Sequence, residues 1–256
     1  MDGQTHAICL THQGSTALLS MNRPNVLNAH DWGLVNELHS ALDELESLPG
    51  IEAVVISGEG RAFSTGIDLT ALAMGELSIE WFRRFDEALR RIELLPLLTV
   101  ARMHGYSLGG GLMIGLACDL RISCDECRFG FPAVSEALVP GMGTYRLPRF
   151  IGLGHAKRLV LTGDLIDART ALAMGLVDWV VPAERLRNAT EDIIERTTRN
   201  SSHARSLARE LVISAFEVDF DHAMERYLDR QQQCLESEAH KRAMQGYLEK
   251  RVMRQR

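Results

Sequence analysis

The sequence predicts an α/β fold with partly parallel strands, followed by a mainly helical C-terminal third. Short apolar runs rich in β-branched residues alternate with helical patterns, an alternation typical of β–α–β units. Two of these runs end in glycine-rich loops. The chain has 256 residues, of which 46% are hydrophobic, so it is long enough to bury one large core.

The first elements are a hairpin, a helix and a buried strand. Two alternating runs, HAICLTH and ALLSMNRP, flank a glycine turn at residues 13–15, which predicts a β-hairpin. Asp31 has the character of a helix N-cap, and apolar residues recur at helical spacing until Pro49-Gly50. The run IEAVVISG, residues 51–58, predicts a buried strand.

The middle of the chain repeats the order of strand, glycine loop and helix. A helix is predicted from Ser78 to Leu95, with Pro96 ending it. LLTVARMH predicts the next strand, and LMIGLACDLRISC predicts a short helix that runs into another strand. The Pro/Gly-rich segment 131–149 predicts a loop. The clearest later helical patterns cover residues 156–163, 167–177 and 216–251.

Composition excludes several classes of function. The formal net charge is -6 and the only basic block is the C-terminal KRVMRQR, so nucleic acid is not favoured as a partner. The sequence contains no run of about 18 apolar residues, so it predicts no membrane span. The N-terminal segment does not resemble a signal peptide. The five cysteines lie scattered in apolar stretches, which favours a cytoplasmic protein.

Cys124 and Cys127 have the spacing of metal ligands. No second pair follows, however, and zinc usually requires four ligands. We therefore interpret the pair as two free thiols and expect no metal site.

The two glycine loops are the main candidates for chemistry. RAFSTGID (residues 61–68) and GYSLGGG (residues 105–111) each follow an apolar strand, so neighbouring strands would deliver them to one edge of a sheet. A helix that starts at Gly109 or Gly110 would direct unpaired N–H groups at a ligand. Two such groups stabilise a carbonyl oxygen that gains negative charge, by several kcal/mol. The alternative is that the glycine triplet only lets a helix pack closely on a sheet.

Six segments in order carry a resemblance to a known family. They are NRPNVLNAH, GRAFSTGIDL, GYSLGGGLMIGLACDLRIS, RFGFPAVSEALVPGMGTYRLPRFIG, LTGDLIDARTALAMGLVDWVV and YLEKR. Together they resemble the enoyl-coenzyme A (CoA) hydratase/isomerase family, the crotonase superfamily. The resemblance implies an α/β crotonase-like spiral of ββα units over residues 1–195 and a C-terminal helical region over residues 196–256. It also implies trimerisation through that region, as a homotrimer or a dimer of trimers.

The family binds acyl thioesters of CoA, so the resemblance implies CoA as part of the substrate and no tightly bound cofactor. By motif, the backbone N–H groups of Ile67 and Gly110 would bind the thioester oxygen. The residues that would contact the CoA part are Asn25, Val26, Ser64, Thr65, Gly66, Asp68 and Lys250. Among these, Asp68 is expected to cap or orient its loop, and a solvated surface role remains open for Lys250.

The chain departs from the family at the residues that transfer a proton in its hydratases. Hydratases of this family use two glutamates, and by motif their positions hold Met113 and Ala133, neither of which transfers a proton. Glu136 is the remaining carboxylate in the second loop, and on a helix it would share a face with Ala133. The alternative for Glu136 is a surface or salt-bridged side chain. Met113, Ala133 and Tyr145 are expected to line an acyl pocket.

These features predict an enzyme that polarises the thioester and forms an enolate-like intermediate. Isomerisation, decarboxylation or other enolate chemistry is then expected as much as hydration, because by motif both hydratase glutamates are replaced. The alternative is a non-catalytic acyl-CoA-binding or assembly subunit of the same fold.

Overall fold

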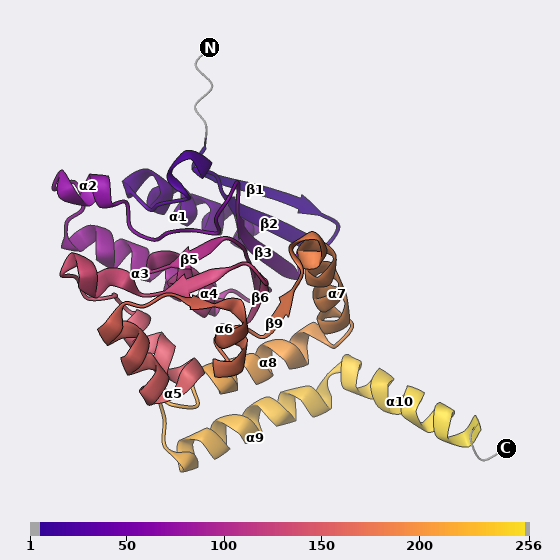
Figure 1. Cartoon of the computed structure of the whole chain (residues 1–256). Coiled ribbons are helices and arrows are strands. Elements are labelled where there is room, and N and C mark those ends of the chain that lie inside the picture. The colour runs from indigo at the N-terminus through magenta and orange to yellow at the C-terminus, as the bar shows by residue number, and fades with distance from the viewer. Residues whose placement is uncertain (1–5, 254–256) are drawn as a thin grey trace. The chain divides into compact units, whose positions relative to one another are not determined.

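The computed structural model describes residues 6–253, and the side chains of residues 6–251. The chain divides into two compact units, residues 1–194 and residues 195–256. The first contains every strand of the described chain and the candidate site (Figure 1). The second contains three helices: α8 (Ser202–Ile213), α9 (Phe220–Glu236) and α10 (Glu238–Met253).

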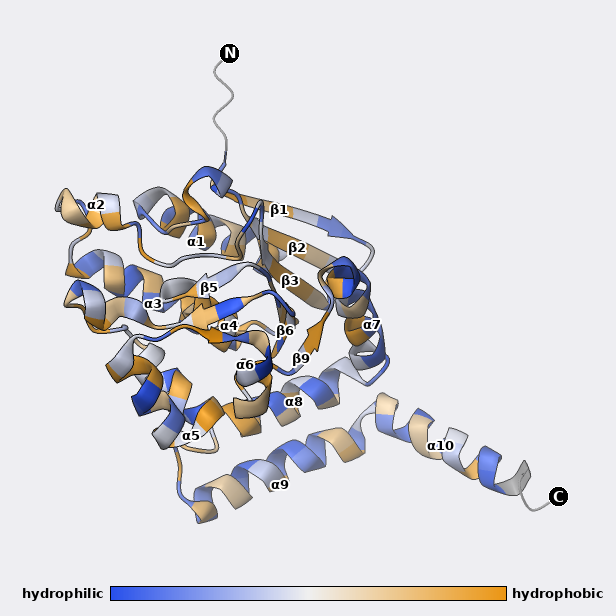
Figure 2. Cartoon of the chain, viewed as in Figure 1, coloured by the Kyte–Doolittle hydropathy of each residue, from blue (hydrophilic) through white to orange (hydrophobic). Residues whose placement is uncertain are grey.

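A six-stranded sheet forms the centre of the first unit, in the order β1-β2-β3-β4-β6-β9. The predicted hairpin is present as an antiparallel pair, and each later neighbour pairs in parallel. The bounds are β1 (Ile8–Gln13), β2 (Thr16–Met21), β3 (Ala53–Gly58), β4 (Leu98–Met103), β6 (Leu120–Cys124) and β9 (Trp179–Val181). Strands β2, β3 and β9 carry strongly hydrophobic colouring in Figure 2. Strand β3 is parallel to both of its neighbours and buried along nearly its whole length, as expected for the centre of such a sheet.

A second, three-stranded sheet consists of β5 (Tyr106–Leu108), β7 (Arg128–Gly130) and β8 (Ile166–Asp167). It gives the chain a repeated order. Strand β4 is followed by β5 and helix α4 (Gly110–Ala117), and strand β6 by β7 and helix α5 (Gly143–Thr162). Each repeat of this order thus places first a short strand and then a helix after a buried strand.

Helices α1 (Trp32–Ser47) and α3 (Ile79–Leu94) contact each other beside the main sheet (Figure 1). The Asp31 side chain accepts the N–H of Leu34, which confirms the predicted N-cap. Both helices bury an apolar stripe, and the stripe on α3 comprises Trp81, Phe85, Ala88, Leu89 and Ile92. The remaining helices of this part are α2 (Leu69–Ala73), α6 (Ala168–Met174) and α7 (Leu186–Thr198), of which the last ends in the second unit.

Two predicted boundaries were wrong. The segment 131–149 is not a continuous loop, because it contains the short 3-10 helix η2 (Pro132–Glu136) and the start of α5. The first residue of α5, Gly143, packs closely on Phe131. A Cβ on Gly143 would lie 2.8 Å from Phe131 Cε1, so this position requires glycine. The single pattern over 216–251 is two helices, separated at Ser237, whose hydroxyl accepts the N–H of His240 and caps α10.

Candidate active site

A cavity of about 300 Å³ lies where the two glycine loops meet helix α3. Helix α3 supplies the aromatic residues Trp81, Phe82 and Phe85 to its wall. The segment from η2 to Gly141 covers another side. A concave, mostly apolar site with a few polar groups is the usual form of a small-molecule pocket.

Ile67 and Gly110 both line this cavity. Neither backbone N–H has a hydrogen-bond partner among the described residues. For Gly110 the reason is its position, because the first N–H groups of a helix have no acceptor one turn earlier. The loops that carry the two residues touch, since a Cβ built on Gly66 would lie 2.8 Å from the Gly110 nitrogen. Gly66 has φ +90°, which also favours glycine there.

Backbone hydrogen bonds fix the two loops to each other. Ser64 and Ser107 form an isolated parallel bridge. The Ser64 N–H donates to the Tyr106 carbonyl at 3.0 Å, and the Leu108 N–H donates to the Ser64 carbonyl at 3.0 Å. Thr65 N–H donates to the Leu27 carbonyl, which ties in a third segment. The wall that carries Ile67 is therefore held by main-chain contacts on both sides.

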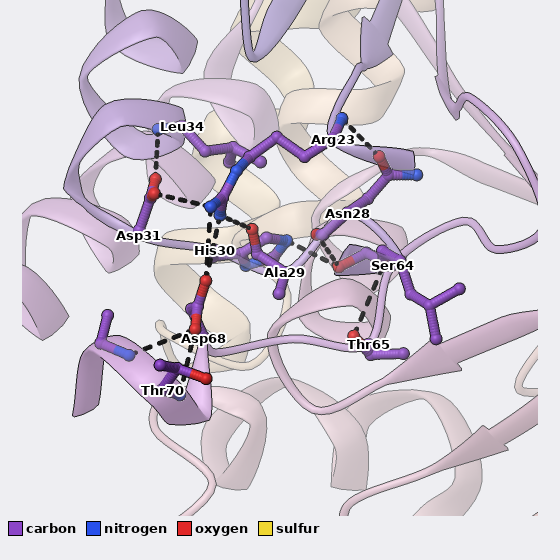
Figure 3. Close-up of polar contacts among 12 residues, drawn as sticks. Arg23, Asn28, Ala29, His30, Asp31, Leu34, Ser64, Thr65, Asp68 and Thr70 are labelled. Carbon is purple, nitrogen blue, oxygen red and sulfur yellow. Dashed lines mark hydrogen bonds and ion pairs between the residues drawn. The ribbon is translucent and has the colours of Figure 1, made fainter. Parts of the chain in front are cut away.

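A buried histidine lies behind this wall (Figure 3). The Ser64 hydroxyl donates to the Asn28 carbonyl at 2.9 Å, so it accepts a hydrogen bond from His30 Nε2 at 2.8 Å. The same Oγ accepts the Gly66 N–H at 3.0 Å. The His30 backbone adds two bonds to the loop, from its N–H to the Gly66 carbonyl and from the Asp68 N–H to its own carbonyl. His30 and Ser64 together therefore set the path of the Gly66–Ile67 peptide.

His30 is fully buried and neutral. Burial, with a smaller contribution from the Arg23 charge, lowers its pKa from 6.5 to about 3. Its Nδ1 has no hydrogen-bond partner among the described residues. The ring packs at a tilt on Phe85, with centroids 5.0 Å apart.

His30 is expected to make the protein sensitive to acid. Between about pH 6.5 and pH 3 the unfolded histidine binds a proton that the folded one does not. Stability is therefore full above pH 6.5 and falls as the pH is lowered through this window, by about 1.4 kcal/mol per pH unit for one group. Urea unfolding at about pH 6.5 and pH 4.5 should show roughly 2–3 kcal/mol less loss in His30→Gln than in the wild type. Equal losses in the two proteins would contradict this assignment.

Arg23 and Asp68 brace the other end of the loop (Figure 3). Arg23 forms ion pairs with Asp31 at 2.9 Å and with Asp68 at 3.3 Å. Asp68 Oδ1 accepts the N–H groups of Thr70 and Ala71 and thus caps α2. The expectation that Asp68 caps its loop is confirmed, and its carboxylate is occupied by these contacts.

Comparison with known proteins identifies the family. The family model for enoyl-CoA hydratase/isomerase matches residues 11–255. The chain belongs to the enoyl-CoA hydratase/isomerase family. It is 33% identical to the short-chain-enoyl-CoA hydratase of Clostridium acetobutylicum and 33% identical to the crotonyl-CoA hydratase of Syntrophomonas wolfei. Each match is over 250 residues and covers 95% of both chains.

Solved structures confirm the predicted crotonase fold. The enoyl-CoA hydratase of Bacillus anthracis superposes with a TM-score of 0.89 at 29% identity, covering 95% of this chain and 96% of that one. Pseudomonas aeruginosa DspI superposes with a TM-score of 0.88 at 29% identity, covering 98% of each chain. As a member of the crotonase superfamily, the chain is an enzyme that acts on acyl-CoA.

Met113 and Ala133, where the resemblance places the two hydratase glutamates, both line the cavity, and Met113 is buried. Glu136 lines it too, from the last residue of η2. Because residues three apart eclipse in a 3-10 helix, Glu136 and Ala133 share a side, as the sequence predicted. The Glu136 side chain is exposed.

Sequence reasoning missed a second carboxylate, Asp86 on α3. Its signal was an acidic residue next to the apolar stripe, one position after Phe85 and four after Phe82. Burial raises the pKa of Asp86 above its ordinary 3.8, and Arg146 partly offsets that rise.

The predicted CoA-contacting residues differ in where they lie. Val26, Thr65 and Asp68 line the cavity. Asn25 is exposed on the 3-10 helix η1 (Pro24–Val26) beside it, whereas Ser64 and Gly66 are buried with their backbone N–H groups already bonded. Lys250 is exposed on α10 in the second unit, and its contact with CoA stays a prediction.

Tyr145 requires a correction, because it does not line this cavity. It lies in the first turn of α5 and is 37% exposed. The Arg149 guanidinium stacks 3.5 Å from its ring centroid. The early start of α5 at Gly143, which the sequence did not predict, accounts for this position.

None of the helices that the structure describes has the length and apolar composition of a transmembrane segment. No group of three histidine, cysteine or acidic side chains within residues 6–253 could hold a metal ion.

Proposed function

We propose that this enzyme binds the acyl part of a CoA thioester in the cavity and polarises the thioester carbonyl with the N–H groups of Ile67 and Gly110. One observation carries the proposal: two backbone donors without partners lie on the wall of one apolar cavity. Donors fixed before the substrate binds need no reorganisation as negative charge develops on the oxygen. CoA then enters as part of the substrate, with Val26 and Thr65 near its adenine end.

The polarised thioester favours loss or transfer of a proton at the α-carbon, because the resulting enolate oxygen is stabilised by the same two donors. Met113 and Ala133 cannot activate water. We therefore propose enolate chemistry, such as double-bond isomerisation or decarboxylation, in preference to two-glutamate hydration. Glu136, the carboxylate that the sequence suggested for the proton transfer, lies on the cavity wall.

We also propose a cytoplasmic homotrimer or dimer of trimers, with the second unit as the contact region. Helix α9 supports this role, because large apolar side chains are exposed on it. They are Phe220, Met224, Tyr227, Leu228 and Leu235.

A panel of esters tests the proposed reaction class. The purified protein is incubated with crotonyl-, 3-hexenoyl-, malonyl- and benzoyl-CoA, and the products are followed by mass and chromatography. We expect conversion of the 3-enoyl or malonyl ester to be faster than hydration of crotonyl-CoA. Faster hydration of crotonyl-CoA would contradict the enolate assignment. Binding of the esters with no conversion of any would instead favour the non-catalytic acyl-CoA-binding subunit.

A further inference from the structure

Asp86 is a carboxylate on the cavity wall that the proposal above leaves without a role. It lies on α3, and its side chain is 23% exposed. An acidic side chain at the edge of an apolar wall is costly unless something holds it. The contacts of the two Asp86 carboxylate oxygens differ.

Arg146 on α5 holds one end of the carboxylate. Asp86 Oδ1 lies 3.5 Å from Arg146 Nη1, and the Met142 N–H also donates to the carboxylate. Arg146 is buried, and its Nε donates to Glu93 on the same face of α3. The charged groups that face Asp86 are therefore Arg146 and Glu93.

The other oxygen lies near Gly141, and so does the end of the Met113 side chain. A Cβ built on Gly141 would lie 3.6 Å from Asp86 Oδ2 and 3.1 Å from Met113 Cε. Because Gly141 has no side chain, it does not cover this oxygen. Met113 stands at the position of the first hydratase glutamate, so Asp86 brings a carboxylate near the place that the glutamate side chain would occupy.

We propose that Asp86 is the catalytic residue that moves the proton at the α-carbon of the bound acyl thioester, an inference that rests on the proposed function. The ionised carboxylate takes the α-proton, and the C–H electron pair becomes the carbon–carbon double bond of the enolate. The carbonyl π pair moves to the thioester oxygen, beside the N–H groups of Ile67 and Gly110. Return of a proton from the Asp86 carboxylic acid to carbon reverses the flow, and no other reactant is required.

Two features favour Asp86 over Glu136 for this step. Asp86 is partly buried and is oriented by Arg146 and Met142, whereas Glu136 is exposed at the end of a short 3-10 helix. General bases work best when held in position and when their pKa lies near the working pH. Burial moves the pKa of Asp86 in that direction.

Exchange of α-hydrogen in heavy water tests this step without knowledge of the natural acyl group. Butyryl-CoA is incubated with the wild type, Asp86→Asn, Glu87→Gln and Glu136→Gln, and deuterium at the α-carbon is followed by mass spectrometry. We expect Asp86→Asn to exchange at least roughly 100-fold more slowly than the wild type. Calorimetry should show that it binds butyryl-CoA within about threefold of the wild type. Glu87→Gln, an exposed carboxylate next to Asp86 on α3 that does not line the cavity, is the matched control and should exchange within about threefold of the wild type. Glu136→Gln tests the other candidate carboxylate, and the proposal requires its loss of exchange to be at least roughly tenfold smaller than that of Asp86→Asn.

The outcomes separate a failure of the proposed function from a failure of the role of Asp86. If the wild type exchanges no α-hydrogen, the enolate chemistry of the proposed function fails, and the role of Asp86 fails with it. If the wild type exchanges and Asp86→Asn exchanges equally fast, only the role of Asp86 is overturned. Loss of exchange in Glu136→Gln alone would assign the step to Glu136.

The wild type provides a second test that does not depend on folding of a variant. Its exchange rate should rise with pH through one ionisation, with a midpoint above the ordinary aspartate value of 3.8. Because Glu136 also lines the cavity, the profile is repeated in Glu136→Gln, where the midpoint should be unchanged. A flat profile, or a midpoint that disappears in Glu136→Gln, would overturn the proposal. A role confined to neutralising Arg146 would leave the exchange profile flat.

Discussion

Gly110→Pro is expected to lose turnover by roughly 10²–10³-fold while binding of the acyl-CoA changes far less. Proline removes the Gly110 N–H, one of the two proposed donors to the thioester oxygen. The substitution suits the helix itself, since Gly110 is the first residue of α4 and proline is favoured there. The loss should therefore appear in kcat of the ester that the panel identifies as substrate.

Gly110→Ala is the matched control. Any Cβ at this position would lie 2.9 Å from His30 Nδ1 and 3.3 Å from Phe85 Cε1, so both variants crowd the same ring. Alanine keeps the N–H, and its turnover should exceed that of the proline variant by at least roughly tenfold. Equal turnover in the two variants would mean that crowding, and not the missing donor, causes the loss.

Arg121→Met is expected to lower the free energy of unfolding by about 3 kcal/mol. Arg121 is 3% exposed on β6 and forms an ion pair with Asp178 at 3.0 Å, just before β9. Its guanidinium also donates to the carbonyls of Leu176 and Cys118 and lies 4.3 Å from the Phe150 ring centroid. Methionine fills the space but leaves a partly buried carboxylate and two carbonyls without their donor.

Urea unfolding at neutral pH measures this loss, with Arg121→Lys as control. Lysine keeps the charge but lacks the planar fork that reaches three acceptors at once, so it should recover less than half of the loss. A change below about 1 kcal/mol in Arg121→Met would show that the network is dispensable. Activity per folded molecule should remain, because Arg121 does not line the cavity.

Much of the fold could be predicted because its signals are local. The hairpin turn at residues 13–15, the Asp31 cap and the stripe on α3 each depend on residues within a few positions of one another. The two glycine loops could be predicted as neighbours because each follows a buried strand, and the ends of neighbouring parallel strands lie at one edge of a sheet. The start of α5 could not, because Gly143 is required by packing against Phe131, twelve residues earlier.

The chemistry of the site depends on contacts that spacing does not reveal. His30 meets Ser64 across 34 positions, and Asp86 meets Arg146 across 60. From the sequence, each is one polar residue near an apolar pattern, with no indication of its partner. Glu136 was predictable because it lies three residues from Ala133, where the resemblance places a hydratase glutamate, in the same loop. Asp86 becomes a candidate only through its contact with Arg146 and its place on the cavity wall.

The carbonyl stretching frequency of a bound thioester tests the central claim most directly. Butyryl-CoA labelled with ¹³C at the thioester carbonyl is bound to the wild type and to Gly110→Pro, and the label is isolated by infrared difference spectroscopy. We predict that the frequency in the wild type is lower than in water, because two fixed donors withdraw electron density from the C=O bond, and that most of the shift is absent in Gly110→Pro. A frequency in the wild type equal to that in water, with the ester bound, would contradict polarisation by Ile67 and Gly110.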